Sequence, residues 1–254
     1  MAQRVRAAAI RERKGRAFAT ITAYDAAFAH AAEAAGIDFI LVGDSLGNVV
    51  LGYDSTVAVT LDDMERHLGA VVRGTERAHV VVDMPFMTYE IGNDDAIRNA
   101  GRMVRAGAQA VKIEGGVERA ERIAAIVNAG IPVCAHIGVV PQTAAISTGF
   151  SRRKDRTKVL ADAEAVAAAG AYAVVLEMVD ADIAGEVTKS IPIPTIGIGS
   201  GNQCDAQILV LYDLLGLTPK PPPFVKAYAN LGEAAIAALR AYAADVESRA
   251  YPAK

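Results

Sequence analysis

Short apolar runs rich in β-branched residues recur along this chain, and they end on ionisable side chains. Five of them end on Asp44, Asp83, Glu114, His136 and Glu177. A strand that is covered on both faces reads as a continuous apolar run, which is typical of parallel sheets. In a (β/α)8 barrel the carboxyl ends of all strands open onto one rim, where ligands bind. The sequence therefore predicts an α/β fold, a (β/α)8 TIM barrel with a polar site at that rim.

Strand-like and helix-like segments alternate from end to end, as expected of consecutive βα units. We expect one barrel domain over residues 1–254, with a C-terminal helical extension at about 231–249. The predicted strands are Ala17–Thr22, Phe39–Val42, His79–Val82, Ala110–Ile113, Pro132–Ala135, Ala173–Leu176, Pro194–Ile198 and Ile208–Tyr212. The predicted helices are Ala26–Ala35, Leu61–Ala78 with a cap formed by Thr60 and Asp63, Asp94–Ala106, Glu118–Ala129, Lys158–Ala169 and Asp182–Ser190.

Charge and cysteine content restrict the classes of function. The 26 basic and 29 acidic residues give a net charge of -3, which does not favour a nucleic-acid or anionic membrane partner. The two cysteines, Cys134 and Cys204, are too few for a disulfide framework. No apolar run approaches the roughly 20 residues that a membrane span needs. We expect a cytoplasmic protein that acts on a small molecule, with no nucleic-acid and no membrane partner.

The ionisable strand ends predict a metal site. Lys112 and Glu114 alternate with Ile113, so both should face the mouth of the barrel. Asp44, Asp83 and Glu114 would form a ring of carboxylates that cannot all stay ionised without a cation. Oxygen ligands favour Mg2+. Such an ion could polarise the carbonyl of a 2-oxo acid and stabilise the neighbouring enolate.

The other polar residues of the rim suit substrate binding and proton transfer. Lys112 and His136 could meet the negative charge of the substrate, and the turn at Ser45 could donate backbone N–H groups. Glu177 remains as a general base. Each residue also has a structural interpretation: a cap for Asp44 and Ser45, a loop start for Asp83, an ion pair of Lys112 with Glu114, a core histidine for His136, and a rim charge for Glu177. Five strands that end on ionisable groups favour the functional interpretation, because such groups are rarely buried unless they bind something.

Three further features need an interpretation. The long segments Asn48–Thr60 and Gly138–Arg156 follow predicted strands and should form lids or binding loops. Thr195–Gly201 is glycine-rich, and it either holds an anion or only permits a tight turn. The remaining histidines should be packing or surface residues: His30, His67 and His79.

Several ordered motifs carry a resemblance to a known family. They are Ile21–Asp25, Leu41–Gly47, Leu51–Thr56, Asp83–Phe86, Val111–Gly116, His136–Gly138 and Pro194–Gly199. With these motifs the chain resembles the 3-methyl-2-oxobutanoate hydroxymethyltransferase (ketopantoate hydroxymethyltransferase) family from about residue 21 to 251.

The resemblance implies a Mg2+-dependent (β/α)8 barrel enzyme of pantothenate biosynthesis. Through a Mg2+-stabilised enolate, it would transfer a hydroxymethyl group from 5,10-methylenetetrahydrofolate to 3-methyl-2-oxobutanoate and form 2-dehydropantoate. It implies Glu177 as the catalytic proton acceptor. The implied metal ligands are Asp44, Asp83 and Glu114, and the implied substrate-binding residues are Asp44, Ser45, Asp83, Lys112 and His136. It also implies a homo-oligomer, commonly a decamer in bacterial members.

The chain departs from the family pattern at a few positions. Met87 and Thr88 stand where the family has Gly-Ser, and the loop at 147–156 lacks the family's Val-Gln-Gly. Ala135 and Ala206 each replace a glycine. Because these changes would alter the substrate or folate pocket, a Mg2+-dependent carbon–carbon lyase or aldolase on another 2-oxo acid is the alternative function. A non-catalytic metabolite-binding barrel is the third hypothesis, and the retention of every inferred ligand argues against it.

Overall fold

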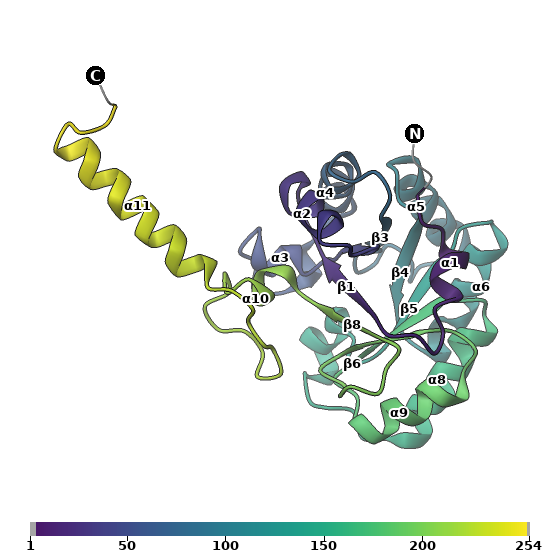
Figure 1. The fold of residues 1–254 in the computed structure, drawn as a ribbon. Helices are drawn as coiled ribbons and strands as arrows, with labels where there is room; N and C mark the ends of the chain where they lie inside the picture. The colour runs from purple at the N-terminus through teal and green to yellow at the C-terminus, as the bar shows by residue number, and fades with distance from the viewer. Residues whose placement is uncertain (1–3, 253–254) are drawn as a thin grey trace. The chain divides into compact units, whose positions relative to one another are not determined.

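The structure, a computed structural model, describes residues 4–252 (Figure 1). The chain divides into two compact units, Met1–Ile208 and Leu209–Lys254. Eight parallel strands, paired in chain order, form a closed barrel that confirms the predicted fold. The strands are β1 Phe18–Thr22, β2 Phe39–Val42, β3 His79–Asp83, β4 Ala110–Glu114, β5 Val133–Gly138, β6 Ala173–Glu177, β7 Thr195–Ile198 and β8 Ala206–Leu209.

Helices follow most of the strands and surround the barrel (Figure 1). The first unit contains α1 Ala7–Arg11, α2 Ala26–Ala34, α3 Leu46–Val49, η1 Thr56–Ala58, α4 Leu61–Arg73, α5 Asn93–Arg105, η2 Val117–Arg119, α6 Ala120–Asn128, α7 Pro141–Thr143, the π-helical turn η3 Ala144–Thr148, α8 Arg156–Ala168 and α9 Ala181–Ser190. The predicted capping box of α4 is present, since Thr60 and Asp63 bond each other's backbone N–H groups.

The inward-facing side chains of the strands pack into an apolar core. Leu41, Val81, Cys134 and Val175 belong to one cluster, and each is 6% exposed or less. Ile10 of α1 joins the same cluster and is completely buried. The N-terminal segment therefore fills the amino end of the barrel, which leaves the carboxyl end for the polar residues.

A buried polar network lies at that amino end. His79, at the start of β3, is completely buried, and its Nδ1 lies 3.0 Å from the Val5 carbonyl oxygen. Because a carbonyl only accepts, Nδ1 carries the proton and Nε2 accepts from the Tyr172 hydroxyl at 2.8 Å. Burial lowers the pKa of His79 to about 4. The predicted packing role of His79 is confirmed.

Three predicted boundaries are wrong by three residues or more. Strand β5 was expected to end at Ala135 but continues to Gly138. The last strand was expected at Ile208–Tyr212, but β8 is Ala206–Leu209. Gln207 is exposed, so this strand is not covered on both faces and does not read as a continuous apolar run. Helix α4 was expected to reach Ala78 but ends at Arg73, with Gly74, a residue of low helix propensity, as its C-cap. A Cβ at Gly74 would lie only 2.4 Å from the Ala26 carbonyl oxygen.

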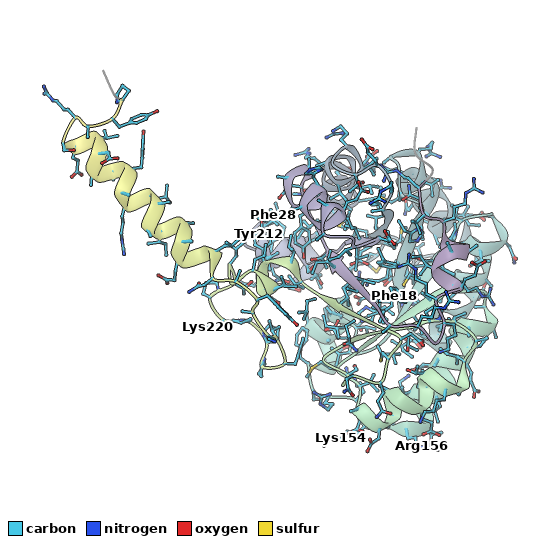
Figure 2. All side chains as sticks on the ribbon, in the orientation of Figure 1. Phe18, Phe28, Lys154, Arg156, Tyr212 and Lys220 are labelled. Atoms are coloured by element: carbon cyan, nitrogen blue, oxygen red, sulfur yellow. The ribbon has the colours of Figure 1, made fainter. Side chains whose placement is uncertain are left out.

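The second unit contains α10 Leu211–Leu214 and α11 Leu231–Glu247. The helical extension predicted at about 231–249 corresponds to α11. None of its side chains is buried, and Figure 2 shows them extending away from the helix. Among residues 4–252, no helix combines the length and the apolar character needed to cross a lipid bilayer.

Candidate active site

The predicted site residues lie together at the carboxyl ends of the strands. Asp83, Glu114 and Glu177 are the last residues of β3, β4 and β6. His136 lies within β5 and pairs with Glu114 across the sheet. Asp44 follows β2 after one intervening residue. Parallel pairing thus brings to one rim residues that are far apart in the sequence.

Lys112 is the cationic centre of this cluster. Its Nζ lies 2.9 Å from Asp83 Oδ1, 3.6 Å from Glu114 Oε1 and 3.1 Å from His136 Nδ1. All four side chains are at most 5% exposed. As predicted, Lys112 shares a face of β4 with Glu114. A buried ammonium with these partners compensates part of the negative charge of the rim.

His136 links two carboxylates. Its Nδ1 lies 3.2 Å from Glu114 Oε1, and its Nε2 lies 3.4 Å from Glu177 Oε2. Glu177 is the more exposed of the two, with 19% of its side chain accessible. The next residue, Met178, has φ of +50°, a left-handed conformation that is unusual for methionine. This turn ends β6 directly after the carboxylate.

Burial and mutual repulsion set the protonation of the cluster. Burial, with repulsion from neighbouring carboxylates, raises the pKa values of Asp44 and Asp83. Burial alone would raise the pKa of Glu114, but Lys112 and His136 outweigh it and lower that pKa. The carboxylates also raise the pKa of Lys112 above its usual value despite burial. They raise the pKa of His136 to about 9, although burial and Lys112 oppose this.

The segment after β2 adds a hydroxyl network. The backbone N–H of Asp44 donates to Asp83 Oδ2 at 2.9 Å, which joins the ends of β2 and β3. Ser45 Oγ lies 2.8 Å from the hydroxyl of Tyr24, which in turn accepts from Thr22 Oγ at 2.8 Å. Two residues of β1 and its loop therefore orient Ser45 at the rim.

Gln142 also belongs to the cluster, although the sequence analysis missed it. It lies on α7, is 1% exposed, and donates from Nε2 to Asp44 Oδ2 at 2.8 Å. Its backbone N–H donates to Glu114 Oε2 at 3.0 Å. Its only signal in the sequence is a position directly after Pro141, a residue favoured in the first turn of a helix.

The donor set suits a hard divalent cation. Within residues 4–252, no three His, Cys, Asp or Glu side chains are already arranged around one point as metal ligands. However, Asp44, Asp83 and Glu114 supply carboxylate oxygens, and Asp44 remains repelled by the other two even with Lys112 present. Oxygen donors with excess negative charge fit Mg2+ chemically.

Comparisons with known proteins decide the family. A family profile described as ketopantoate hydroxymethyltransferase matches residues 4–254. The chain belongs to the ketopantoate hydroxymethyltransferase family, and it is an enzyme. It is 51% identical over 246 residues to the 3-methyl-2-oxobutanoate hydroxymethyltransferase of Pyrobaculum islandicum, covering 95% of this chain and 94% of the relative. It is also 51% identical to the protein of that name from Carboxydothermus hydrogenoformans, covering 98% and 93% of the two chains.

Solved structures outside this family share the barrel. A 2,3-dimethylmalate lyase of the PEP mutase/isocitrate lyase superfamily superposes with a TM-score of 0.64 at 20% identity, covering 98% of this chain and 89% of that one. A phosphonopyruvate hydrolase in complex with oxalate and Mg2+ gives a TM-score of 0.64 at 17% identity, covering 96% and 88%. At such low identity, the likeness supports the fold only.

Two of the departures from the ketopantoate hydroxymethyltransferase pattern, Met87–Thr88 and the segment 147–156, lie on rim loops, whereas Ala135 and Ala206 lie within β5 and β8. Met87 is 48% exposed and has φ of +65°, so the backbone keeps a left-handed conformation that glycine adopts without strain. In the loop at 147–156, Arg152 donates to the carbonyl oxygens of Val179 at 2.8 Å and Gly199 at 2.6 Å. Arg156, labelled in Figure 2, pairs with Glu186 of α9. These arginines anchor the altered loop beside β6 and β7.

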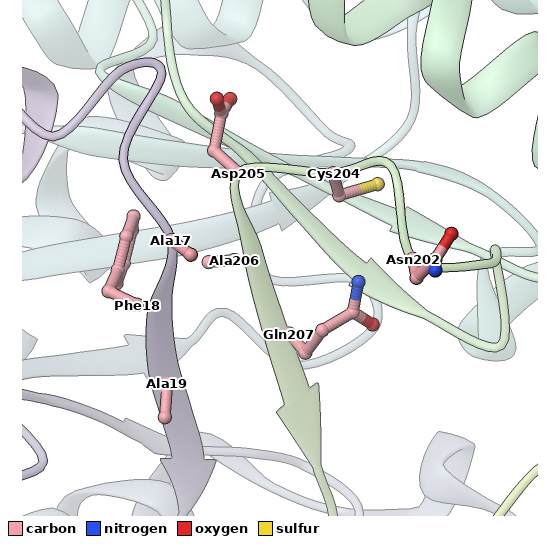
Figure 3. Close-up of a pocket in the computed structure, with 8 residues that line it drawn as sticks. All are labelled: Ala17, Phe18, Ala19, Asn202, Cys204, Asp205, Ala206 and Gln207. Carbon is pink, nitrogen blue, oxygen red and sulfur yellow. The ribbon is translucent and has the colours of Figure 1, made fainter.

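A pocket of about 390 Å3 lies elsewhere on the barrel (Figure 3). Its lining comes from the starts of β1 and β8 and the loop before β8: Ala17, Phe18, Ala19, Asn202, Cys204, Asp205, Ala206 and Gln207. None of the clustered rim residues lines it. This pocket is therefore separate from the candidate active site.

Proposed function

We propose that this protein transfers a hydroxymethyl group from 5,10-methylenetetrahydrofolate to 3-methyl-2-oxobutanoate, forming 2-dehydropantoate for pantothenate biosynthesis. The observation that carries the proposal is one continuous cluster of contacts from buried Asp44 to partly exposed Glu177, in a chain about half identical to proteins named for this reaction. Composition and family resemblance further support a cytoplasmic homo-oligomer, for which a decamer is the expected assembly.

Three carboxylates would hold the metal and two cations would hold the substrate. Asp44, Asp83 and Glu114 would bind Mg2+, which, when bound, supplies electron withdrawal from the keto group of the oxo acid. Lys112 and His136 lie at the same rim, 3.1 Å apart, and would donate hydrogen bonds to the carboxylate and keto oxygens. Ser45, fixed by Tyr24, would donate a further hydrogen bond.

Glu177 is placed to move the proton. Its carboxylate would accept the proton of C3 of the oxo acid, and the resulting enolate would form the new carbon–carbon bond with the methylene carbon of the folate. Both bonds between the methylene carbon and the folate nitrogens break, water supplies the hydroxyl group on that carbon, and tetrahydrofolate leaves with its two nitrogens protonated by the proton from Glu177 and one proton of the water. His136 Nε2 lies 3.4 Å from Glu177 Oε2, and 19% of the Glu177 side chain remains accessible.

The test is formation of 2-dehydropantoate from the two substrates, with Mg2+ and with excess EDTA. Because Gln cannot accept the C3 proton, we expect Glu177→Gln to lower kcat by about 100-fold or more. Glu164→Gln, at an exposed position of α8, is the matched control and should behave as the parent. Turnover that persists in EDTA or in Glu177→Gln would refute the proposed roles.

The second candidate is a Mg2+-dependent lyase or aldolase on another 2-oxo acid. Met87 favours it, because a methionine side chain replaces a hydrogen atom on a rim loop. Aldol cleavage or addition that needs no folate, measured with a panel of 2-oxo acids and aldehydes, would support this candidate. Its absence, together with folate-dependent product, would exclude it.

A further inference from the structure

We propose that Gln142 is a positioning residue that fixes two of the proposed metal ligands, Asp44 and Glu114, in one arrangement. This inference rests on the proposed function, because it assumes that those carboxylates bind Mg2+. The hydrogen bonds of Gln142 go to Asp44, Met84, Tyr89 and Glu114, and not to the proposed base Glu177 or to Lys112. Its effect should therefore appear in metal affinity before it appears in proton transfer.

The geometry is that of a clamp with two donors from one residue. The side-chain Nε2 of Gln142 donates to Asp44 Oδ2 at 2.8 Å, and its backbone N–H donates to Glu114 Oε2 at 3.0 Å. Each contact uses one oxygen of its carboxylate. The other oxygen of Glu114, Oε1, faces Lys112 and His136. Gln142 thus fixes one oxygen of Asp44 and one oxygen of Glu114, and Lys112 and His136 contact the second oxygen of Glu114.

The neighbours of Gln142 determine the orientation of its amide. Nε2 also donates to the Met84 carbonyl oxygen at 3.0 Å, and a carbonyl can only accept. Oε1 accepts from the Tyr89 hydroxyl at 2.7 Å. A flipped amide would place its oxygen against two acceptors, so the NH2 group must face Asp44. Three hydrogen bonds therefore hold the side chain, one to Asp44 after β2 and two to Met84 and Tyr89 on the loop after β3.

Tyr89 makes this lock part of a longer chain of contacts. Its side chain is 1% exposed, and its hydroxyl also lies 3.4 Å from the Glu114 carbonyl oxygen. Tyr89 follows Met87 by two residues on the loop after β3. The loop that departs from the family pattern therefore also carries the residue that orients Gln142.

A neutral donor suits this position. Asp44 is buried and its backbone N–H contacts Asp83, so another acid at position 142 would add negative charge to a cluster of carboxylates, and a cationic side chain would compete with the metal for them. An amide donates a hydrogen bond without changing the net charge available to a cation. Hydrogen bonds to metal ligands from surrounding residues commonly contribute 10- to 100-fold in metal affinity, and we expect about this effect for Gln142.

The experiment measures Mn2+ binding by electron paramagnetic resonance of the free ion, together with Mg2+ titration of the reaction. Gln142→Met keeps side-chain volume and the backbone N–H but removes the amide. We expect its Mn2+ Kd to rise by about 10- to 100-fold, with a matching rise in the Mg2+ needed for half-maximal rate. At saturating Mg2+, kcat should largely recover, which a misfolded site would not allow.

Two further variants keep the test decisive. Gln109→Met is the matched control, because Gln109 lies at the amino end of β4, away from the rim. Its amide bonds the backbone N–H of Val80 and the carbonyl oxygen of Gly107. The Mn2+ Kd of this variant should equal that of the parent. Tyr89→Phe keeps the ring but removes the hydrogen bond from the Tyr89 hydroxyl to Gln142 Oε1. This variant should raise the Mn2+ Kd by several-fold, and it provides the test if Gln142→Met does not fold.

The outcomes separate this inference from the proposed function. Unchanged Mn2+ affinity in folded Gln142→Met, or in Tyr89→Phe if Gln142→Met does not fold, would overturn the positioning role. A parent protein that binds Mn2+ but makes no 2-dehydropantoate would refute the proposed reaction and leave the role of Gln142 intact. A parent that binds no divalent ion would overturn both the metal site and this inference.

Discussion

Acid should destabilise this barrel through one buried histidine at its amino end. His79 is held neutral, with a pKa of about 4 in the folded protein against about 6.5 when exposed. Because the folded state binds the proton more weakly than the unfolded state, stability is complete above pH 6.5 and falls as the pH drops toward 4. At about 1.36 kcal/mol for each tenfold change in proton affinity, the whole loss is ~3 kcal/mol, of which ~2.5 kcal/mol has occurred by pH 4.5.

The assay is urea unfolding of the parent and of His79→Gln at pH 7.5 and pH 4.5. The variant loses packing against Phe39 and Tyr172, whose ring centroids lie 5.5 and 5.4 Å from that of His79, so it should be less stable at pH 7.5. Because Gln does not titrate, this penalty should shrink by ~2.5 kcal/mol at pH 4.5. His30→Gln, at an exposed position of α2, is the control. A penalty that stays constant between the two pH values would refute the reasoning.

Three further predictions concern the rim. Met87→Gly should stabilise the fold by about 1 kcal/mol in urea unfolding, since it relieves a left-handed methionine that is half exposed; equal or lower stability would contradict this. Gly138→Ala should cost more than about 2 kcal/mol, because φ is +98° and a Cβ would lie 2.3 Å from the Glu177 carbonyl oxygen; a stable variant would show that β5 and β6 can move apart. Mg2+ at about 100 times its Kd should raise the Tm of the parent by roughly 5–10 °C, and EDTA should reverse this rise. In the control variant Asp83→Asn, which lacks a proposed metal ligand, Mg2+ should leave the Tm unchanged.

The sequence was sufficient to predict the barrel and the residues at its rim. Strands buried on both faces leave continuous apolar runs, so the positions of Asp83, Glu114 and Glu177 followed from where those runs stop. β8 was misplaced because Gln207 breaks its run, while the apolar residues beyond it enter α10. Periodicity over so few residues does not distinguish a strand from a short helix.

Gln142 and the anchoring arginines could not be predicted in the same way. Their roles come from contacts across the barrel, such as the hydrogen bond between Gln142 and Asp44, which are 98 positions apart. Arg152 likewise depends on carbonyl groups of β6 and β7 loops that carry no local sequence signal. The function of a polar loop residue depends on tertiary contacts, so an analysis of each sequence segment by itself does not predict that function.

Lys112 has a consequence for how the protein acquires metal. With its ammonium 2.9 Å from Asp83 and 3.6 Å from Glu114, the chain carries its own counterion into the barrel mouth. Folding therefore need not wait for Mg2+, unlike small zinc domains whose folding free energy is supplied by the ion. Newly synthesised protein can complete its barrel first and load metal afterwards, so chelation should yield a folded enzyme that regains activity on simple dialysis into Mg2+.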